Sequence, residues 1–194
     1  MLFCPFSPTH DFPCHFDQKI GPLGCRFLAR TLKNGHCPKL VHLNLGWCNI
    51  KKLGGDSLVD AFSNIPPHRT VMEHLDLRMN HIPPTTIQKL CDTLIEGSLC
   101  TLRVLDLRHN SIGDDGALAL ARCMLKGGLK NLEQLQLMHN LIFDTGTESL
   151  FKAFTSEEAP QKCPEIKCID LRENPASPEL KRRMSSLAPI FFQF

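Results

Sequence analysis

The residues that could do chemistry are histidines, aspartates and a cysteine at matching points of similar segments. His109 and His139 lie thirty residues apart, in LRHN and LMHN. With Asp106 or Cys168 they would form a metal or acid–base site, because imidazole, carboxylate and thiolate groups supply both chemistries. The sequence implies neither an open cavity nor a third ligand, so we interpret these residues as exposed surface residues.

The N-terminal segment holds a second group, Cys4, His10, Cys14 and His15, with the composition of a zinc site but a spacing that matches no standard one. The chain has no G-x-x-x-x-G-K-[ST] phosphate loop and no G-x-S-x-G nucleophile motif. We therefore predict no catalytic residue, no metal and no cofactor, and expect that the protein is not an enzyme.

Composition bounds the classes of function. The chain has 194 residues, 42% of them hydrophobic, and a net charge of +2 from 22 Lys and Arg against 20 Asp and Glu. This balance gives no electrostatic case for a nucleic acid or an anionic membrane as partner. No apolar run approaches the ~20 residues that span a bilayer.

The compartment is predicted from the N-terminus and the cysteines. The opening MLFCPFSPTHDF has no Lys or Arg and is broken by prolines, unlike a signal peptide. The ten cysteines are spread singly, which suits buried thiols in a reducing compartment. We expect the cytoplasm, with the nucleus and cytoskeletal or ciliary structures left open.

The elements that would position these residues recur along the chain. The template L-x-x-L-x-L-x-x-N-x-I fits five segments, with Cys48 in the Asn slot of the first and a weak final position, Ala176, in the last. The segments begin 32, 30, 30 and 34 residues apart, and chance matches would not keep such a register. They are 40–50, 72–82, 102–112, 132–142 and 166–176.

Each unit changes its period part-way. Leu105 and Leu107 alternate with a polar residue, which predicts a strand with one buried face. Ala117, Leu120 and Met124 follow at spacings of three and four, which predicts a helix. One unit is thus a strand, a turn, a helix and a return loop, and stacking of units must supply the core. Other expected helices follow Pro83-Pro84 or span Ser57–Phe62, Thr145–Phe154 and Ser177–Leu187.

These motifs resemble leucine-rich repeats, and the run Ile112-Gly-Asp-Asp-Gly-Ala-Leu-Ala-Leu-Ala is similar to the long, helix-containing repeats of the ribonuclease-inhibitor type. The resemblance covers about residues 20–187. It implies an α/β fold, a curved solenoid with parallel strands on the concave face and helices on the convex face. It also implies a protein-binding scaffold, although no partner carries over, because the concave residues define specificity.

Three divisions of the chain are expected. An irregular Phe-, Pro- and Cys-rich segment covers 1–18, the repeat array covers 19–187, and an apolar tail covers 188–194. The array begins with a partial repeat whose strand half would lie at 10–18, where His10, Pro13 and His15 occupy the apolar slots.

Residues between the buried leucines should point onto the concave sheet. An Asp column beside an Arg column predicts a ladder of surface ion pairs. Trp, Met and Arg on such a face are typical of protein interfaces. The predicted protein-binding residues are Trp47, Asp76, Arg78, Met79, Asp106, Arg108, His109, Gln136, Met138, His139 and Arg172.

The recurring asparagines have a structural interpretation. They follow each strand where the chain turns inward, and stacked side chains can bond backbone groups of neighbouring turns. We expect a ladder and no ligand at Asn80, Asn110, Asn140 and Asn174.

The predicted function is a non-catalytic scaffold that binds a protein of unknown identity through the concave sheet, as a monomer or as a subunit of a larger assembly. One alternative is a regulator of a small GTPase that resembles the Ran GTPase-activating protein, although the chain lacks a long acidic tail and has about half the repeats. Another is a structural component of a cytoskeletal or ciliary assembly that docks by its tails, which hold 7 of the 12 Phe residues.

Overall fold

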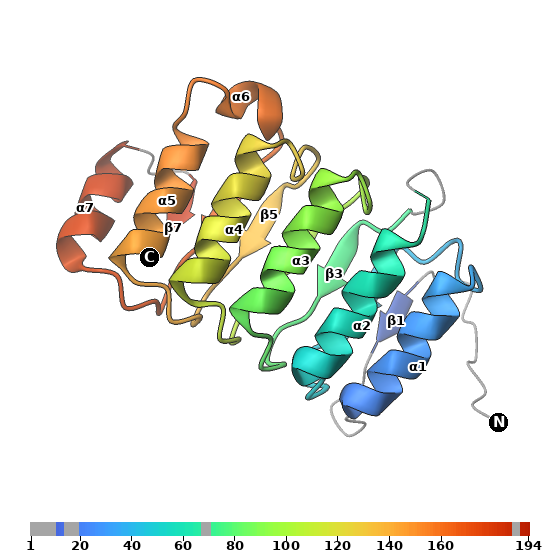
Figure 1. Ribbon diagram of the computed structural model, residues 1–194. Helices are drawn as coiled ribbons and strands as arrows, with labels where there is room; N and C mark the ends of the chain where they lie inside the picture. The colour runs from blue at the N-terminus through green and yellow to red at the C-terminus, as the bar shows by residue number, and fades with distance from the viewer. Residues whose placement is uncertain (1–10, 14–19, 67–70, 188–190) are drawn as a thin grey trace.

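The structure is a computed structural model that describes residues 11–13, 20–66, 71–187 and 191–194. Strands and helices alternate along this part of the chain (Figure 1). The strands are β1 (Asp11–Pro13), β2 (His42–Asn44), β3 (His74–Asp76), β4 (Val104–Asp106), β5 (Gln134–Gln136), β6 (Cys168–Asp170) and β7 (Phe192–Gln193). The helices are α1 (Gly21–Lys33), α2 (Lys51–Ser63), α3 (Pro84–Ile95), α4 (Gly113–Leu125), α5 (Asp144–Phe154), α6 (Ala159–Lys162) and α7 (Pro178–Leu187).

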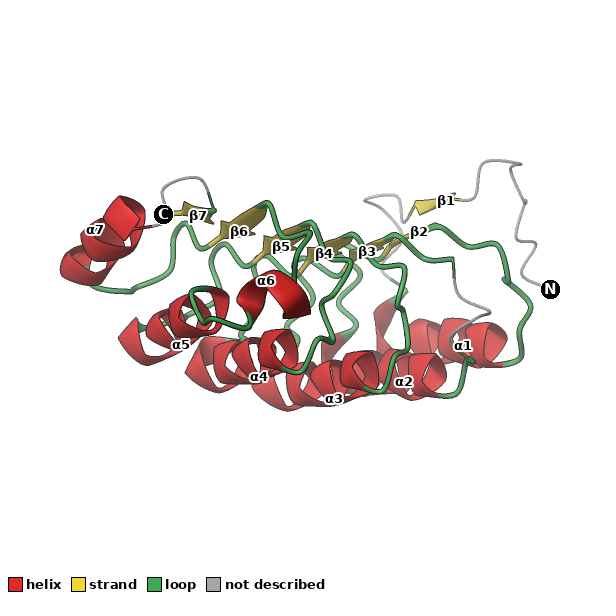
Figure 2. Cartoon of the chain, turned by 90° about the horizontal axis from the view of Figure 1, so that it is seen from above, coloured by secondary structure: helices red, strands yellow, loops and turns green. Residues whose placement is uncertain are grey.

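The strands form one parallel sheet in chain order, β1 to β7. Figure 2 shows the sheet along one side and the long helices along the other, with the array bent so that the sheet is concave. The α/β solenoid predicted from the repeats is confirmed. The register aligns Leu43, Leu75, Leu105, Leu135 and Ile169, all at most 1% exposed, so one apolar column runs between the two layers.

The asparagine ladder is also confirmed. Asn110 Nδ2 donates to the Leu77 carbonyl oxygen at 3.0 Å in the preceding repeat and to the Leu107 carbonyl oxygen at 2.9 Å in its own. Its Oδ1 accepts from the backbone N–H of Asn80 and of Ile82. Asn80, Asn140 and Asn174 repeat the pattern and are all buried. The turns after β3 to β6 are therefore bonded to their neighbours by buried asparagine side chains.

Helix α2 corrects one prediction. The sequence predicts Ser57–Phe62, but the helix spans Lys51–Ser63, because two glycines near its start allow close packing. A Cβ at Gly54 would lie 3.0 Å from Cys25 Cβ on α1, and one at Gly55 would lie 2.9 Å from Thr86 Cγ2 on α3. The glycines that weaken the local helix signal are thus the residues that bring three helices together.

The first strand corrects another. The sequence alignment places Pro13 in a buried-leucine slot, whereas the register pairs Phe12 with Leu43 and Pro13 with Asn44. The predicted register is therefore wrong by one residue. The segment expected to be irregular also contains a strand, β1. Proline is tolerated there because β1 is an edge strand among those described. Cys4, His10, Cys14 and His15 lie outside the described residues.

The last residues close the other end of the sheet. Phe191 O accepts from Ile169 N at 2.6 Å and Gln193 O from Leu171 N at 2.8 Å, which adds β7 to β6. Phe192 is 4% exposed, and its ring centroid lies 5.7 Å from that of Phe151 and 5.5 Å from that of Phe154. The described part of the apolar tail thus packs on the core of its own chain.

A survey of the described helices finds none that combines the length and the apolar character needed to cross a membrane.

Candidate protein-binding face

The centre of the concave sheet is a column that ends each strand. Asn44, Asp76, Asp106, Gln136 and Asp170 are aligned by the register, as the sequence predicts. In four of the five, the side-chain oxygen accepts from the backbone N–H two residues on, at 2.9 Å in Asn44, 3.0 Å in Asp76, and 3.1 Å in Asp106 and Asp170. This bond turns the chain out of the strand, which short Asn and Asp side chains do well.

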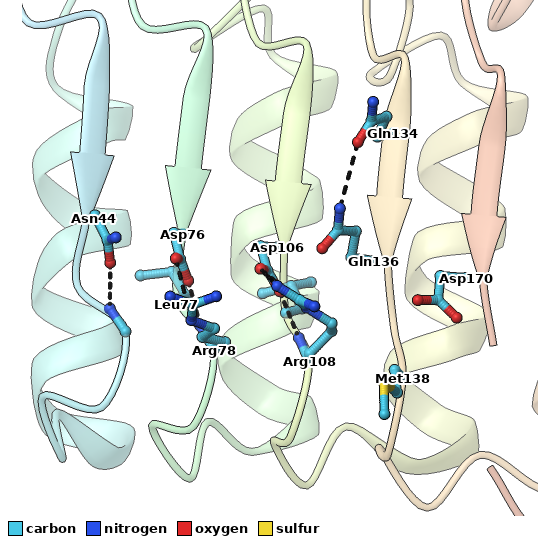
Figure 3. Close-up of polar contacts among 12 residues, drawn as sticks. Asn44, Asp76, Leu77, Arg78, Asp106, Arg108, Gln134, Gln136, Met138 and Asp170 are labelled. Atoms are coloured by element: carbon cyan, nitrogen blue, oxygen red, sulfur yellow. Dashed lines mark hydrogen bonds and ion pairs between the residues drawn. The ribbon is translucent and has the colours of Figure 1, made fainter. Parts of the chain in front are cut away.

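Three arginines fold back onto these carboxylates, each within its own repeat, and Figure 3 shows two of them, Arg78 and Arg108. Arg108 Nη2 lies 2.6 Å from Asp106 Oδ2, and its Nε donates to both carboxylate oxygens. Arg172 Nη2 lies 2.8 Å from Asp170 Oδ2. Arg78 Nε is farther from Asp76 Oδ2, at 3.4 Å. The predicted ladder of ion pairs exists, and each pair belongs to one repeat.

Burial corrects part of the predicted surface. Asp106 and Asp170 were expected on an exposed face, but only 6% and 4% of them are exposed, because each lies under its own arginine. Burial favours the neutral form and raises the pKa of Asp170, but hydrogen bonds from Arg172 outweigh it, so the pKa is lowered. At Asp76 burial dominates and the pKa is raised. The aspartates therefore hold the arginines in place, while Arg108 and Arg172 face the solvent.

The third column has a left-handed backbone in every repeat. Its φ angles run from 52° to 63° at Trp47, Met79, His109, His139 and Glu173. Residues other than glycine rarely adopt this conformation, and its presence in all five repeats shows that the turn itself requires it. The side chains at these positions are nevertheless large, and Trp47 is 43% exposed.

The histidines lie side by side but do not make a metal centre. The ring centroids of His109 and His139 are 4.8 Å apart, and His139 Nδ1 lies 3.5 Å from Glu173 Oε2. His42 and His74 make a second pair with centroids 4.4 Å apart. Within the described ranges, no three His, Cys, Asp or Glu residues are arranged to hold a metal ion.

Strand β5 interrupts the ladder. Gln136 and Met138 stand where β3, β4 and β6 carry an aspartate and an arginine. Gln136 Nε2 donates to Gln134 Oε1 at 3.3 Å (Figure 3). Both residues were in the predicted set, yet sequence reasoning missed the interruption, although reading down the columns shows it.

Comparisons with known proteins support the repeat assignment. A family model described as "Leucine Rich repeat" matches residues 36–59 and 98–121. This chain contains leucine-rich repeats. The two matched segments contain β2 with the start of α2, and β4 with the start of α4, so the family signal lies on the concave strands and their turns.

The leucine-rich repeat chain is also similar to a solved structure titled "Leiomodin-1 Actin-Binding Site 2 (ABS2)". The identity is 13%, the match covers 94% of this chain and 82% of that chain, and the TM-score is 0.47. A likeness at this level supports no inference about what this chain binds. A comparison with curated proteins finds no match.

Proposed function

We propose that this leucine-rich repeat protein is a non-catalytic scaffold that binds a protein partner through its concave sheet. The observation that carries the proposal is an exposed tryptophan, Trp47, with half-buried methionines, beside ion pairs whose charges cancel. Trp47 is 43% exposed at the edge of a face whose three aspartates each hold their own arginine. Protein interfaces are enriched in Trp, Met and Arg, the residue types that this face presents.

The balanced charges of the concave face favour short-range recognition of a partner over long-range electrostatic attraction. Asp76, Asp106 and Asp170 balance Arg78, Arg108 and Arg172, so the centre of the face carries little net charge. Long-range attraction of a highly charged partner would need an unbalanced patch. The partner surface we expect is therefore largely neutral, with apolar groups for Trp47, Met79 and Met138.

The proposal extends to the subtype of the repeats and to the cellular compartment. The long repeats are of the ribonuclease-inhibitor type, since a helix of 11 to 13 residues follows each of β2 to β5. The protein works in a reducing compartment, the cytoplasm, where buried thiols such as Cys25, Cys91 and Cys123 stay reduced. Burial raises the pKa of Cys25 to about 12, which suits an inert core residue.

The two alternatives fare differently. No feature of the described residues favours regulation of a small GTPase, which stays a hypothesis for an assay with candidate GTPases. Docking by the C-terminal tail is disfavoured, since Phe192 is 4% exposed and packed against α5. The side chains of the N-terminal phenylalanines, Phe3, Phe6, Phe12 and Phe16, lie outside the described residues.

The test compares two double variants with matched losses of apolar surface. Trp47→Ala/Met79→Ala removes concave side chains, and Leu53→Ala/Leu118→Ala removes side chains 49% and 43% exposed on α2 and α4. Affinity capture from cell extract, read by mass spectrometry, should lose a partner only with the concave variant, by about tenfold or more. Circular dichroism confirms folding of both. Equal capture by both variants and the native chain would remove the concave face from the proposal.

A further inference from the structure

The interruption of the ladder at β5 differs from every neighbouring strand. In β3, β4 and β6 the chain's own guanidinium covers the centre column. In β2 the second position is Gly46, and Arg78 fills that space, since a Cβ on Gly46 would lie 3.1 Å from Arg78 Cγ. The Met138 side chain has no N–H or O–H to donate to Gln136. Among the repeats of β2 to β6, only the repeat of β5 lacks an arginine side chain beside its centre-column residue, either its own or one from a neighbouring repeat.

Gln136 is left with an unmet acceptor. Its Nε2 reaches Gln134 Oε1 at 3.3 Å, but its Oε1 is buried and accepts no hydrogen bond from the described residues. The equivalent Asp106 and Asp170 on the neighbouring strands each accept from a backbone N–H and from a guanidinium. Gln136 as a residue is half-buried, so a turn of its amide can present this oxygen to a donor from outside the chain. A buried acceptor without a donor is costly, so such a donor would gain more here than at any satisfied position.

The charges around Gln136 select the kind of donor. The register places Asp106 and Asp170 on either side of it, one strand away. Arg108 and Arg172 already neutralise these carboxylates at 2.6 and 2.8 Å. An arriving cation would therefore find no unpaired carboxylate, and an arriving carboxylate would face the Gln136 carbonyl oxygen. An uncharged donor avoids both penalties.

Resting on the proposed function, we propose that Gln136 and Met138 form the anchor subsite of the concave face. The subsite takes an uncharged side chain that donates a hydrogen bond, of which the amide of a partner asparagine or glutamine is the best fit. The amide N–H donates to Gln136 Oε1, and the carbon atoms of the partner side chain lie against Met138. The partner thereby supplies in trans the donor that the other repeats supply themselves.

The deciding experiment gives the β5 repeat the aspartate–arginine pair of the neighbouring repeats, and the protein with this pair is called the closed variant. The variant Gln136→Asp/Met138→Arg gives β5 the pair found in β3, β4 and β6, and circular dichroism with thermal unfolding establishes that it is folded. A phage-displayed library of random peptides is selected on the full native chain and counter-screened on the closed variant. We expect native-selected peptides to be enriched in Asn and Gln and to bind the closed variant about tenfold more weakly or worse.

A single substitution separates the donor classes. Gln136→Glu should weaken the selected peptides, because a neutral partner amide would have to desolvate a carboxylate that has no counter-ion. Tighter binding to this variant, with enrichment of Lys or Arg, would overturn the neutral-donor assignment.

The two proposals can fail separately. Peptides lost on Trp47→Ala/Met79→Ala but bound equally by the closed variant would place recognition on the concave face and overturn the anchor. Peptides insensitive to both sets of changes, or an absence of enriched peptides, would overturn the anchor, while the capture experiment decides the scaffold.

Discussion

The buried turn and the concave face use side chains that are close in sequence for opposite purposes. In the turn, Asn110 bonds backbone groups of the preceding repeat as well as its own. On the face, two and four residues earlier, Arg108 and Asp106 bond each other inside one strand. Coupling between repeats thus runs through the turn, whereas each ion pair on the face is closed within its repeat. The pair formed by Asp106 and Arg108 can therefore change without losing a hydrogen bond to the next repeat, which suits a surface that sets specificity.

The largest expected effect is at the turn. Asn110→Ala removes two donated bonds and leaves the backbone N–H groups of Asn80 and Ile82 without their acceptor. Unsatisfied buried groups cost about 1–3 kcal/mol each, so we expect a loss of about 3–5 kcal/mol in the free energy of unfolding by urea titration. Asn110→Asp should not restore this loss, because it keeps the acceptor but turns a carboxylate oxygen towards the carbonyl oxygens of Leu77 and Leu107. A loss of less than about 1 kcal/mol for the alanine variant would contradict the contrast between the buried turn and the concave face.

An intermediate effect is expected on the helical side, where Asp56 of α2 also joins two repeats. Its carboxylate lies 2.6 Å from Lys52 Nζ and 2.9 Å from Lys89 Nζ, and accepts from Thr86 Oγ1 at 2.6 Å. Burial alone would raise its pKa, but these three bonds lower it from 3.8 to about 2.

Because the pKa of Asp56 is lower in the folded protein, its contribution is complete above about pH 4 and is lost as the pH falls towards 2. After allowance for solvent screening, Asp56→Asn should cost about 1 kcal/mol at pH 7 and flatten that part of the stability profile. Asp60→Asn, on the exposed side of the same helix, is the control. Identical acid profiles for the native chain and the Asp56 variant would contradict the assignment.

The smallest effect on stability is expected on the concave face. Trp47 is 43% exposed, so Trp47→Ala should change the free energy of unfolding by no more than about 0.5 kcal/mol. Thermal and urea unfolding measure this directly. A loss near that of Asn110→Ala would mean that Trp47 supports the fold, and the contrast between turn and face would fail.

Much of this architecture follows from the spacing of residues. The period of about thirty and the alternation around Leu105 predict the strands, their register and the asparagine ladder, because both layers need an apolar residue at fixed steps. The columns of the concave face follow from the same alignment. The fold and the columns of the concave face could therefore be predicted from the sequence.

The rest depends on tertiary contacts that no local pattern carries. The true length of α2 rests on glycines that face other helices, and the pairing of Phe12 rests on a strand too short to show alternation. The aligned columns predict the pair of Asp106 and Arg108 but not the burial of Asp106 beneath its arginine. The special place of Gln136 appears only when its unmet oxygen is compared with the satisfied carboxylates beside it.

The shortness of the strands sets the size of any complex. Strands β2 to β6 have three residues each, so the sheet is a strip about 10 Å wide. Seven strands about 4.8 Å apart make it roughly 29 Å long, or about 300 Å² in outline. A standard interface takes about 800 Å² from each partner. A partner that contacts only the strands would dissociate quickly. A long residence time requires a partner that also contacts the turns, which carry Trp47, Met79, His109 and His139.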